Sequence, residues 1–253
     1  IPIMYDRLCK VFKKLNIDYE IIFVNDCSPD ESENIIRRLS SKNSRVIGIS
    51  HSRNFGSQAA FLSGIKISKK ESCVLLDGDL QDPPEVIESF IQKWREGYDI
   101  VYGVRVKREM PIYIEFYYKL FYYIFSKLSS FEIPQNAGDF SLIDRKAIKW
   151  ILQFNETDYF LRGIRAYIGF KQIGVDYVRP ERKFGKSTNS VFKNIGWAKK
   201  AIFSYSNIPL NLITLIGFLS VICTIFLISY VIIVKFLFWE EIPEGITTVS
   251  ILI

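Results

Sequence analysis

Short apolar runs and helical stretches follow one another along the first part of the chain. The runs typical of β-strands are Tyr19–Asp26, Arg45–Ser50, Cys73–Asp79 and Tyr98–Gly103. The stretches between them that favour helix are Glu31–Ser41, Gly56–Ser68 and Pro84–Glu96. Strands that alternate with helices of about ten residues predict βαβ units, and therefore an α/β domain with a mostly parallel sheet. Ligands of such sheets collect at the carboxyl ends of the strands.

The amino-terminal stretch IPIMYDRLCKVFKKL predicts an amphipathic helix that is already under way at the first residue. Its expected apolar face carries Ile3, Leu8, Val11, Phe12 and Leu15. No initiator methionine precedes it, and the other end of the chain stops inside the apolar run ITTVSILI. We therefore expect the sequence to be a fragment of a longer protein.

A long segment without charged residues, Ile208–Val234, indicates a membrane-bound chain. A helix of that length would measure ~40 Å, more than the ~30 Å hydrocarbon core of a bilayer. The alternative is a buried core helix, but soluble cores rarely need so long an uncharged run. Lysines precede the segment and glutamates follow it, which predicts a cytoplasmic location for the large amino-terminal part. Gly245–Ile253 would begin a second span, giving a multi-pass protein of an inner, plasma or ER-type membrane.

Two aromatic segments suit the headgroup zone of a bilayer. Ile112–Leu128 is crowded with tyrosine and phenylalanine but is interrupted by charges, so it is too charged and too short to span. Ser190–Ser206 combines lysines with Trp197 and Phe203 directly before the uncharged segment. Both are expected to be interfacial helices. The alternative for each is ordinary helix packing against the sheet.

The net charge of +6 and the basic residues between Arg179 and Lys200 suit either nucleic acid or the anionic face of a membrane. Nucleic-acid binding explains neither the uncharged segment nor the acidic cluster in CVLLDGDLQDPPE, Cys73–Glu85. No nucleic-acid partner is therefore expected, and the lipid bilayer is.

That acidic cluster contains Asp77 and Asp79 on either side of Gly78. If the strand continues through them, its period of two places both carboxylates on one face. Together with the amide oxygen of Gln81 they would form a hard oxygen site for Mg²⁺ or Mn²⁺. The alternative is a pair of solvated turn aspartates. Asp82 precedes two prolines and Glu85, so we expect it to cap the next helix rather than bind a metal.

Five motifs occur in order before the uncharged segment: VNDCSPDES, HSRNFGSQAAFLSGI, LLDGDLQDPPE, GDFSLIDRKA and PERKFGKS. With them the chain resembles the family-2 glycosyltransferases of GT-A (Rossmann-like) fold. It is most similar to the polyprenyl-phosphate branch, which includes dolichyl-phosphate mannose synthases and bacterial undecaprenyl-phosphate glucosyltransferases. The resemblance covers essentially the whole chain.

The resemblance implies a membrane-anchored inverting enzyme that moves a sugar from a UDP- or GDP-linked donor to undecaprenyl or dolichyl phosphate, for cell-surface glycan or protein glycosylation. It implies a cytoplasmic GT-A domain over residues 1–189, without the family's first strand and its P-x-[YF]-N-E segment. A juxtamembrane helix over 190–206 and membrane helices over 208–234 and 245–253 would follow. Two alternatives stay open: a polysaccharide acceptor, and a scaffold that binds nucleotide sugars without turnover. A homo-oligomer is also left open.

The same resemblance implies roles for individual residues on the donor side of the site. Asp26, with Asp30 nearby, would bind the base or ribose of the nucleotide. Asp77, Asp79 and Gln81 fall on the D-x-D-x-Q pattern that faces the nucleotide sugar and a divalent ion at the diphosphate, and Asp79 is expected to be catalytic as well as a metal ligand. Arg53 would touch the nucleotide or cap the sheet edge. His51, the only histidine, is expected to pack rather than react.

On the acceptor side, Asp139 in GDFSL falls on the family's deeper aspartate, a candidate catalytic base or acceptor-positioning group. The alternative for Asp139 is a turn residue after Gly138. Arg162 is a further candidate for binding phosphate by family pattern. Arg182, Lys186 and Ser187 suit capture of the lipid phosphate or diphosphate, because they offer a guanidinium fork, an ammonium and a hydroxyl. The alternative for the last group is a solvated basic loop near anionic lipid.

Overall fold

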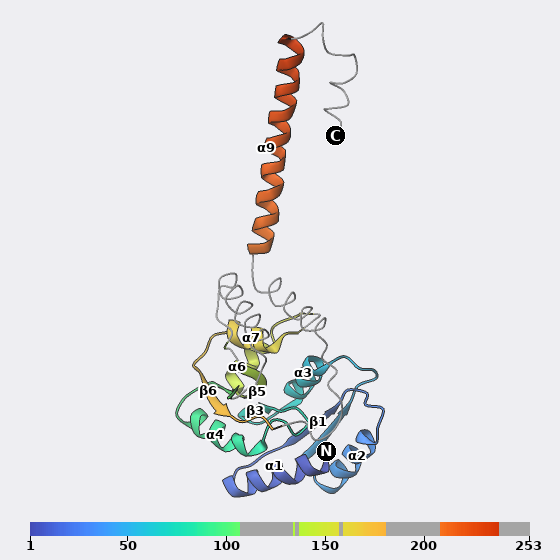
Figure 1. Cartoon of the computed structure of the whole chain (residues 1–253). Coiled ribbons are helices and arrows are strands. Elements are labelled where there is room, and N and C mark those ends of the chain that lie inside the picture. Colours follow the sequence, from blue (N-terminus) through green and yellow to red (C-terminus); the bar gives the residue numbers. More distant parts are fainter. Residues whose placement is uncertain (107–133, 135–136, 157–158, 181–207, 238–253) are drawn as a thin grey trace. The chain divides into compact units, whose positions relative to one another are not determined.

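The structure is a computed structural model that describes residues 1–106, 134, 137–156, 159–180 and 208–237 (Figure 1). The chain divides into two compact units, Ile1–Ala201 and Ile202–Ile253, each of which is described by itself. The predicted interfacial helices over 112–128 and 190–206, and the predicted second span over 245–253, lie outside the described residues.

The described part of the first unit alternates strands and helices as the sequence predicts, up to β4. The elements in chain order are α1 (Pro2–Leu15), β1 (Ile21–Asn25), α2 (Ser32–Lys42), β2 (Val46–Ser50), α3 (Ser57–Ile67), β3 (Ser72–Leu75), the 3₁₀ turn η1 (Pro84–Val86), α4 (Ile87–Arg95), β4 (Ile100–Arg105), β5 (Ala137–Asp144), α6 (Arg145–Ile151), α7 (Leu161–Tyr167) and β6 (Gln172–Tyr177).

The strands form two sheets rather than one. β1 and β2 pair in parallel, and the remaining strands form a second sheet in the order β3-β5-β4-β6. In that second sheet β5 runs antiparallel to both of its neighbours, while β4 and β6 are parallel. The prediction of a mostly parallel sheet is therefore wrong, and the sheet is mixed. The reason is that β5 does not continue the βαβ series but enters between β3 and β4 from the opposite direction.

The core of the first unit lies where α1 and α4 cover the sheets. Met4, Leu8 and Val11 of α1 are buried with Phe90 of α4 in one apolar cluster. The ring of Phe90 packs against that of Phe140 in β5, with the ring centroids 4.7 Å apart. The amphipathic helix expected at the amino terminus is therefore confirmed, except that Ile3 is exposed and Met4 takes its place on the buried face.

The described part of the second unit is the helix α9 (Ile208–Leu237). Within it, Leu210–Leu237 has a mean hydropathy of 2.6 and is not buried against other residues. Among the described residues this is the one helix that is long and apolar enough to cross a membrane, judged by length and composition. The expectation of a long apolar helix over 208–234 is confirmed.

Candidate active site

Asp26, directly after β1, is held by groups from the loop that leads into α3. Its carboxylate accepts hydrogen bonds from the backbone amides of Phe55 (2.8 Å) and Gly56 (2.7 Å). Nδ1 of His51 lies 2.8 Å from the same carboxylate. Burial alone would raise the pKa of Asp26, but the two amides and His51 outweigh it and hold that pKa below its usual value. Asp26 is thus a preorganised anionic group at the end of a strand.

His51 connects Asp26 to the middle of α3, because its Nε2 lies 2.9 Å from Oγ of Ser63. The expectation that His51 packs is confirmed, and the structure adds that it bridges two polar side chains. Ser63 was not predicted from the sequence as a partner of His51. The geometry resembles a Ser–His–Asp array, but Ser63 sits within a regular helix and lacks the strained turn that exposes a nucleophilic serine.

Asp30 and Arg53 lie near this group without joining it. Asp30 is exposed and accepts a hydrogen bond from the amide of Ser32 (3.0 Å), which lowers the pKa of Asp30. Arg53 is also exposed, and its guanidinium lies 4.5 Å from the centroid of the Phe55 ring. Arg53 therefore lies on the loop that holds Asp26, whereas the hydrogen bond of Asp30 is to the start of α2.

The second acidic group follows β3, in a turn rather than in a strand. β3 ends at Leu75, so the condition for placing Asp77 and Asp79 on one face of a strand is not met. Leu80 has a φ of 63°, and Oδ1 of Asp79 accepts a hydrogen bond from the amide of Gln81 (3.1 Å). The side-chain amide of Gln81 donates to the carbonyl of Pro180 (3.4 Å). These bonds determine the shape of the turn.

Asp82 has a different role from the one expected. η1 begins at Pro84 after Pro83, without a hydrogen bond from a capping side chain, so the prediction that Asp82 caps it is wrong. Asp82 is 1% exposed and accepts a hydrogen bond from the hydroxyl of Tyr177 (2.5 Å). Nε of Arg179 lies 3.4 Å from the same carboxylate. Asp82 thus points inward and joins the turn after β3 to the end of β6.

Asp139 of β5 is held from two elements. Its Oδ1 accepts a hydrogen bond from Nε of Arg162 in α7 (3.1 Å), and its Oδ2 accepts one from Nε2 of Gln58 in α3 (3.1 Å). Oε1 of the buried Gln58 in turn accepts a hydrogen bond from the amide of Leu161 (2.9 Å). The side chain of Asp139 is 13% exposed. The structure therefore pairs Asp139 with Arg162, two residues that the family pattern singled out separately.

Asp26 and Asp139 both bind groups at the start of α3. The amide of Gly56 binds Asp26, and the side chain of Gln58 binds Asp139. Asp77 belongs to the same neighbourhood, because burial, followed by the charges of Asp139, Asp82 and Asp79, raises its pKa to about 6. Four carboxylates thus create a negative potential that favours a cation.

Arginines offset part of this negative charge. Arg179 lies 3.8 Å from Oδ2 of Asp79, besides its contact with Asp82. Nε of Arg105 donates to the hydroxyl of Tyr177 (3.3 Å). Burial and the hydrogen bond to Asp82 raise the pKa of Tyr177 to about 12, and they outweigh Arg105, which lowers that pKa. Arg165 is buried, and its guanidinium lies 5.0 Å from the centroid of the Tyr102 ring. Burial lowers the pKa of Arg165 to about 10.

Several of these residues were not predicted from the sequence, namely Gln58, Asp82 as a site residue, Arg105, Arg165, Tyr177 and Arg179. Arg179 had a local signal, because it opens the stretch RPERKFGKS from which Arg182, Lys186 and Ser187 were chosen. Those three lie outside the described residues. The others carry no signal in the sequence, because their partners are up to 95 positions away.

A metal would have to rely on few protein ligands. Within the part of the chain that the structure describes, no group of three or more histidine, cysteine, aspartate or glutamate side chains could hold a metal ion. Mg²⁺ is commonly bound through one or two carboxylates together with substrate phosphates and water. Asp77 and Asp79 would supply two such carboxylates. The excess of negative charge around Asp77 would favour a cation there.

The comparison with known families identifies the chain. The family model for glycosyl transferase family 2 matches residues 2–152. An uncharacterized glycosyltransferase of Bacillus subtilis (strain 168), YkcC, is 39% identical over 85% of this chain and 67% of its own length. The prophage bactoprenol glucosyl transferase homolog of Escherichia coli (strain K12) is 35% identical over 86% of this chain and 71% of its own. The bactoprenol glucosyl transferase of Shigella phage SfX is also 35% identical, over 86% and 72%.

Among solved structures, the mannosyltransferase PcManGT from Pyrobaculum calidifontis in complex with GDP-Man and Mn²⁺ matches with a TM-score of 0.45. It is 18% identical, and the match covers 72% of this chain and 55% of that one. The sequence comparisons carry the assignment. The chain belongs to glycosyl transferase family 2, and it is a glycosyltransferase.

Proposed function

We propose that this glycosyltransferase moves a sugar, with inversion, from a UDP- or GDP-linked donor to a polyprenyl phosphate. The observation that carries the proposal is the meeting of Asp26 and the Asp77–Asp139 group at the start of α3. A nucleotide sugar needs both a polar group for its nucleoside and a charged region for its diphosphate. The name of the Shigella phage relative, a bactoprenol glucosyl transferase, supports a polyprenyl acceptor.

On the donor side, Asp26 would accept hydrogen bonds from the base or ribose, with Asp30 and Arg53 bordering the nucleotide. The bonds that already hold Asp26 support this role, because a carboxylate in a preset position loses little conformational entropy when it binds. Asp77, Asp79 and the amide oxygen of Gln81 would hold Mg²⁺ or Mn²⁺. The ion would supply positive charge to the nucleoside diphosphate that leaves when the glycosidic bond breaks.

On the acceptor side, Asp139 would position the lipid phosphate rather than remove a proton. The second pKa of a phosphate monoester is ~6, so its oxygen is already a nucleophile at neutral pH. The bonds of Asp139 to Arg162 and Gln58 support a positioning role, because they fix the carboxylate from two sides. Arg162, together with Arg182, Lys186 and Ser187, would bind the phosphate oxygens as charged and polar donors.

The proposal includes a location. α9 would anchor the chain in a cell membrane, with the amino-terminal unit in the cytoplasm and the segments 112–128 and 190–206 at the lipid surface. A second span from Gly245 would complete a multi-pass anchor. The exposed apolar surface of α9 supports the membrane location, because side chains of this kind are stable in lipid and not in water.

The test is an assay for glycosyl-phospholipid with the purified chain, a panel of UDP- and GDP-sugars and polyprenyl phosphate. We expect product in the presence of Mn²⁺ or Mg²⁺, its loss after chelation, and recovery when the metal is restored. Asp79→Asn should lower the rate by about 100-fold or more, as expected when a group that stabilises the leaving group is lost. Asp176→Asn, an exposed carboxylate in β6, is the matched control and should keep full activity.

Any of four results would overturn the proposal. Full activity of Asp79→Asn, or activity that persists without a divalent ion, would exclude the assigned metal chemistry. Nucleotide-sugar binding without any product would indicate a scaffold, and product on a polysaccharide alone would indicate a different acceptor.

A further inference from the structure

The ring of His51, directly after β2, is held on every side that the structure describes. The backbone amide of His51 donates to the carbonyl of Asn25 at the end of β1 (2.9 Å). Nδ1 lies 2.8 Å from Oδ1 of Asp26, and Nε2 lies 2.9 Å from Oγ of Ser63 in α3. The ring also packs at right angles against that of Phe55, with the centroids 5.5 Å apart. Both ring nitrogens are therefore in hydrogen bonds, and the side chain is only 12% exposed.

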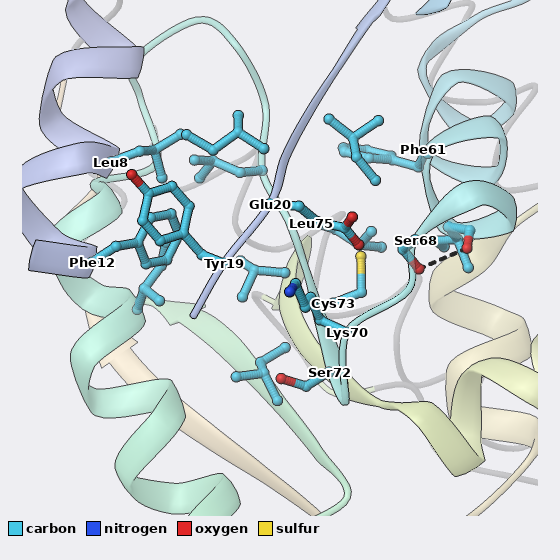
Figure 2. Close-up of a pocket in the computed structure, with 18 of the residues that line it drawn as sticks. Leu8, Phe12, Tyr19, Glu20, Phe61, Ser68, Lys70, Ser72, Cys73 and Leu75 are labelled. Carbon is cyan, nitrogen blue, oxygen red and sulfur yellow. Dashed lines mark hydrogen bonds between the residues drawn. The ribbon is translucent and has the colours of Figure 1, made fainter. Parts of the chain in front are cut away.

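Ser63 lies on a different side of α3 from the residues beside the neighbouring cavity. That cavity measures about 800 Å³ and is lined by residues of α1, β1 and β3, and Figure 2 shows Phe61 and Ser68 of α3 beside it. The residues of α3 that line it follow the three- and four-residue spacing of one helix face: Ser57, Ala60, Phe61, Gly64, Ile65 and Ser68. Ser63 falls outside this set, and its hydroxyl is turned toward the loop after β2.

The hydroxyl of Ser63 has a different partner from those of other helix serines. Ser40 and Ser41 in α2 donate to carbonyls three positions earlier, a local bond that helix serines commonly make. Ser220 in α9 makes the same kind of bond. The hydroxyl of Ser63 instead lies at hydrogen-bond distance from Nε2 of His51. A serine hydroxyl has one proton to donate, and an imidazole nitrogen without a proton can accept it.

These partners determine where the proton of His51 lies. The pKa of Asp26 is held below its usual value, so its carboxylate is ionised and can only accept. Nδ1 must therefore carry a proton in order to bond to Asp26. When Ser63 donates to Nε2, that nitrogen carries none, and His51 is a neutral imidazole. In a histidine the bond made by one ring nitrogen sets the protonation of the other.

The bond from His51 falls on the oxygen of Asp26 that already has another donor. Oδ1 accepts from Nδ1 and from the amide of Phe55, and Oδ2 accepts from the amide of Gly56. A carboxylate offers about four lone-pair positions. Among the described residues these three donors leave about one position, on Oδ2. Asp26 therefore presents one acceptor position to a ligand, and turning the carboxylate would break the bonds that hold it.

We propose that Ser63 and His51 are positioning residues for the nucleoside of the donor. Ser63 holds His51 as the tautomer with its proton on Nδ1, and His51 holds Asp26 so that Oδ2 keeps one acceptor position for a single hydrogen bond from the nucleoside. The inference rests on the proposed function, in which Asp26 binds the base or ribose. Neither Ser63 nor His51 touches the donor, and no proton is transferred along the Ser63–His51–Asp26 array.

The first measurement reads the protonation of His51 directly. His51 is the only histidine, so with isotope-labelled histidine in the intact chain, purified without a histidine tag, every imidazole signal belongs to it. Long-range proton–nitrogen correlation spectra at about pH 8, where an unperturbed histidine is neutral, distinguish the two tautomers and the imidazolium. We expect the proton on Nδ1 and none on Nε2.

The second measurement removes the hydroxyl. In Ser63→Ala, Nε2 loses its donor, so we expect a mixture of the two neutral tautomers. Affinity for UDP or GDP, whichever binds, should fall about three- to tenfold in calorimetry with Mn²⁺, as expected for the loss of one hydrogen bond. In the transferase assay the KM for the donor should rise while kcat stays within about twofold, because the lost interaction acts in binding.

Two further variants separate the hydroxyl from its surroundings. Ser63→Thr keeps the hydroxyl and should keep both the tautomer and the affinity of the unmodified chain. Ser40→Ala is the matched control, because it removes a helix hydroxyl that bonds to the carbonyl of Arg37 in α2, and it should change neither.

Any of four results would overturn the inference. A proton on Nε2 in the unmodified chain, as the other tautomer or as the imidazolium, would contradict the assigned contacts. An unchanged tautomer in Ser63→Ala would mean that Ser63 does not set it. A changed tautomer with unchanged affinity would mean that the array does not position Asp26 for the donor. Equal losses of affinity in Ser63→Ala and Ser63→Thr would indicate packing rather than the hydroxyl.

Failure of the proposed function gives a different result. The protonation of His51 is measured without donor, metal or turnover. A chain that transfers sugar but carries the proton on Nε2 would support the proposed function and overturn the array. A chain that shows the proton on Nδ1 but binds neither nucleotide would contradict the proposed function, and with it the role of the array in binding the donor.

Discussion

Asp26 illustrates how neighbouring donors turn a strand-end carboxylate into a fixed anion. Two backbone amides and His51 surround it, and its side chain is only 17% exposed. The pKa of Asp26 in the folded state is therefore lower than in the unfolded chain, where it is ~3.9. A carboxylate with a lowered pKa stabilises the fold above the unfolded pKa, and this contribution is lost as the pH falls through the folded value.

We predict that Asp26→Asn lowers the free energy of unfolding by about 1.5–3 kcal/mol near pH 6, the usual worth of hydrogen bonds to a charged group. The difference in the free energy of unfolding between the two proteins should shrink below about pH 4, because protonated Asp26 no longer offers a charged acceptor to these hydrogen bonds. Urea unfolding followed by tryptophan fluorescence at pH 6 and pH 3 measures it. The comparison cancels the other carboxylates, and a difference that is equal at both pH values would contradict the prediction.

Residue contacts of this kind could not be predicted from the sequence. The acids Asp26, Asp77, Asp79 and Asp139 stand out because they follow apolar runs or match a family pattern. Their partners do not, because tertiary packing brings Gln58 to Asp139 across 81 positions. The prediction that Asp82 caps the next helix was wrong for the same reason. The hydroxyl of Tyr177 donates a hydrogen bond to that carboxylate in place of the helix terminus.

At the scale of elements, α3 is the part that holds the site together. Gln58, near its start, is buried and connects α3 to β5 through Asp139 and to α7 through the amide of Leu161. Removing it would leave a buried backbone amide without an acceptor and free one oxygen of Asp139.

We therefore predict that Gln58→Ala lowers the free energy of unfolding by about 1–3 kcal/mol, the cost of an unsatisfied buried donor. Under the proposed function it should also lower the turnover rate, because among the described residues Asp139 then keeps only its bonds to Arg162. Gln153→Ala, in which an exposed glutamine after α6 is changed, is the matched control and should change stability by less than about 0.5 kcal/mol. Equal stability of the two variants would contradict the role given to Gln58.

Elements with strong local patterns were predicted from the sequence, but the antiparallel direction of β5 in the sheet was not. β1, β2, β4 and the helices α1 to α3 lie within a residue or two of the predicted ranges, and the predicted helix Pro84–Glu96 divides into η1 and α4. β3 ends early, at Leu75, because the chain turns before the acids. β5 and β6 were not predicted as strands. A period of two shows that a segment can form a strand, but it does not encode whether the neighbour runs parallel or antiparallel.

At the scale of the whole molecule, the composition of α9 leads to a prediction about location. Its apolar side chains are exposed along the full helix, including Ile216, Leu219 and Ile225. An arginine at the centre of a membrane helix costs about 3 kcal/mol on the insertion scale. Changing all three residues to arginine should therefore release the chain from membranes washed with alkaline carbonate.

The matched control exchanges the same positions among isoleucine and leucine, and it should stay in the membrane fraction. Immunoblots of pellet and supernatant compare the two variants. Retention of the triple-arginine variant in the pellet would show that segments other than α9 are sufficient to hold the chain.

The position of β5 has a consequence for how the protein is made. β5 lies between β3 and β4 in the sheet but follows both in the chain. As the chain leaves the ribosome, translation must continue from Arg105 to Asp144, a further 39 residues (144 − 105), before the central strand is complete. At ~5–20 residues per second this takes roughly two to eight seconds. During that interval the nascent chain presents open strand edges, and a chaperone that binds emerging polypeptides would have most effect then.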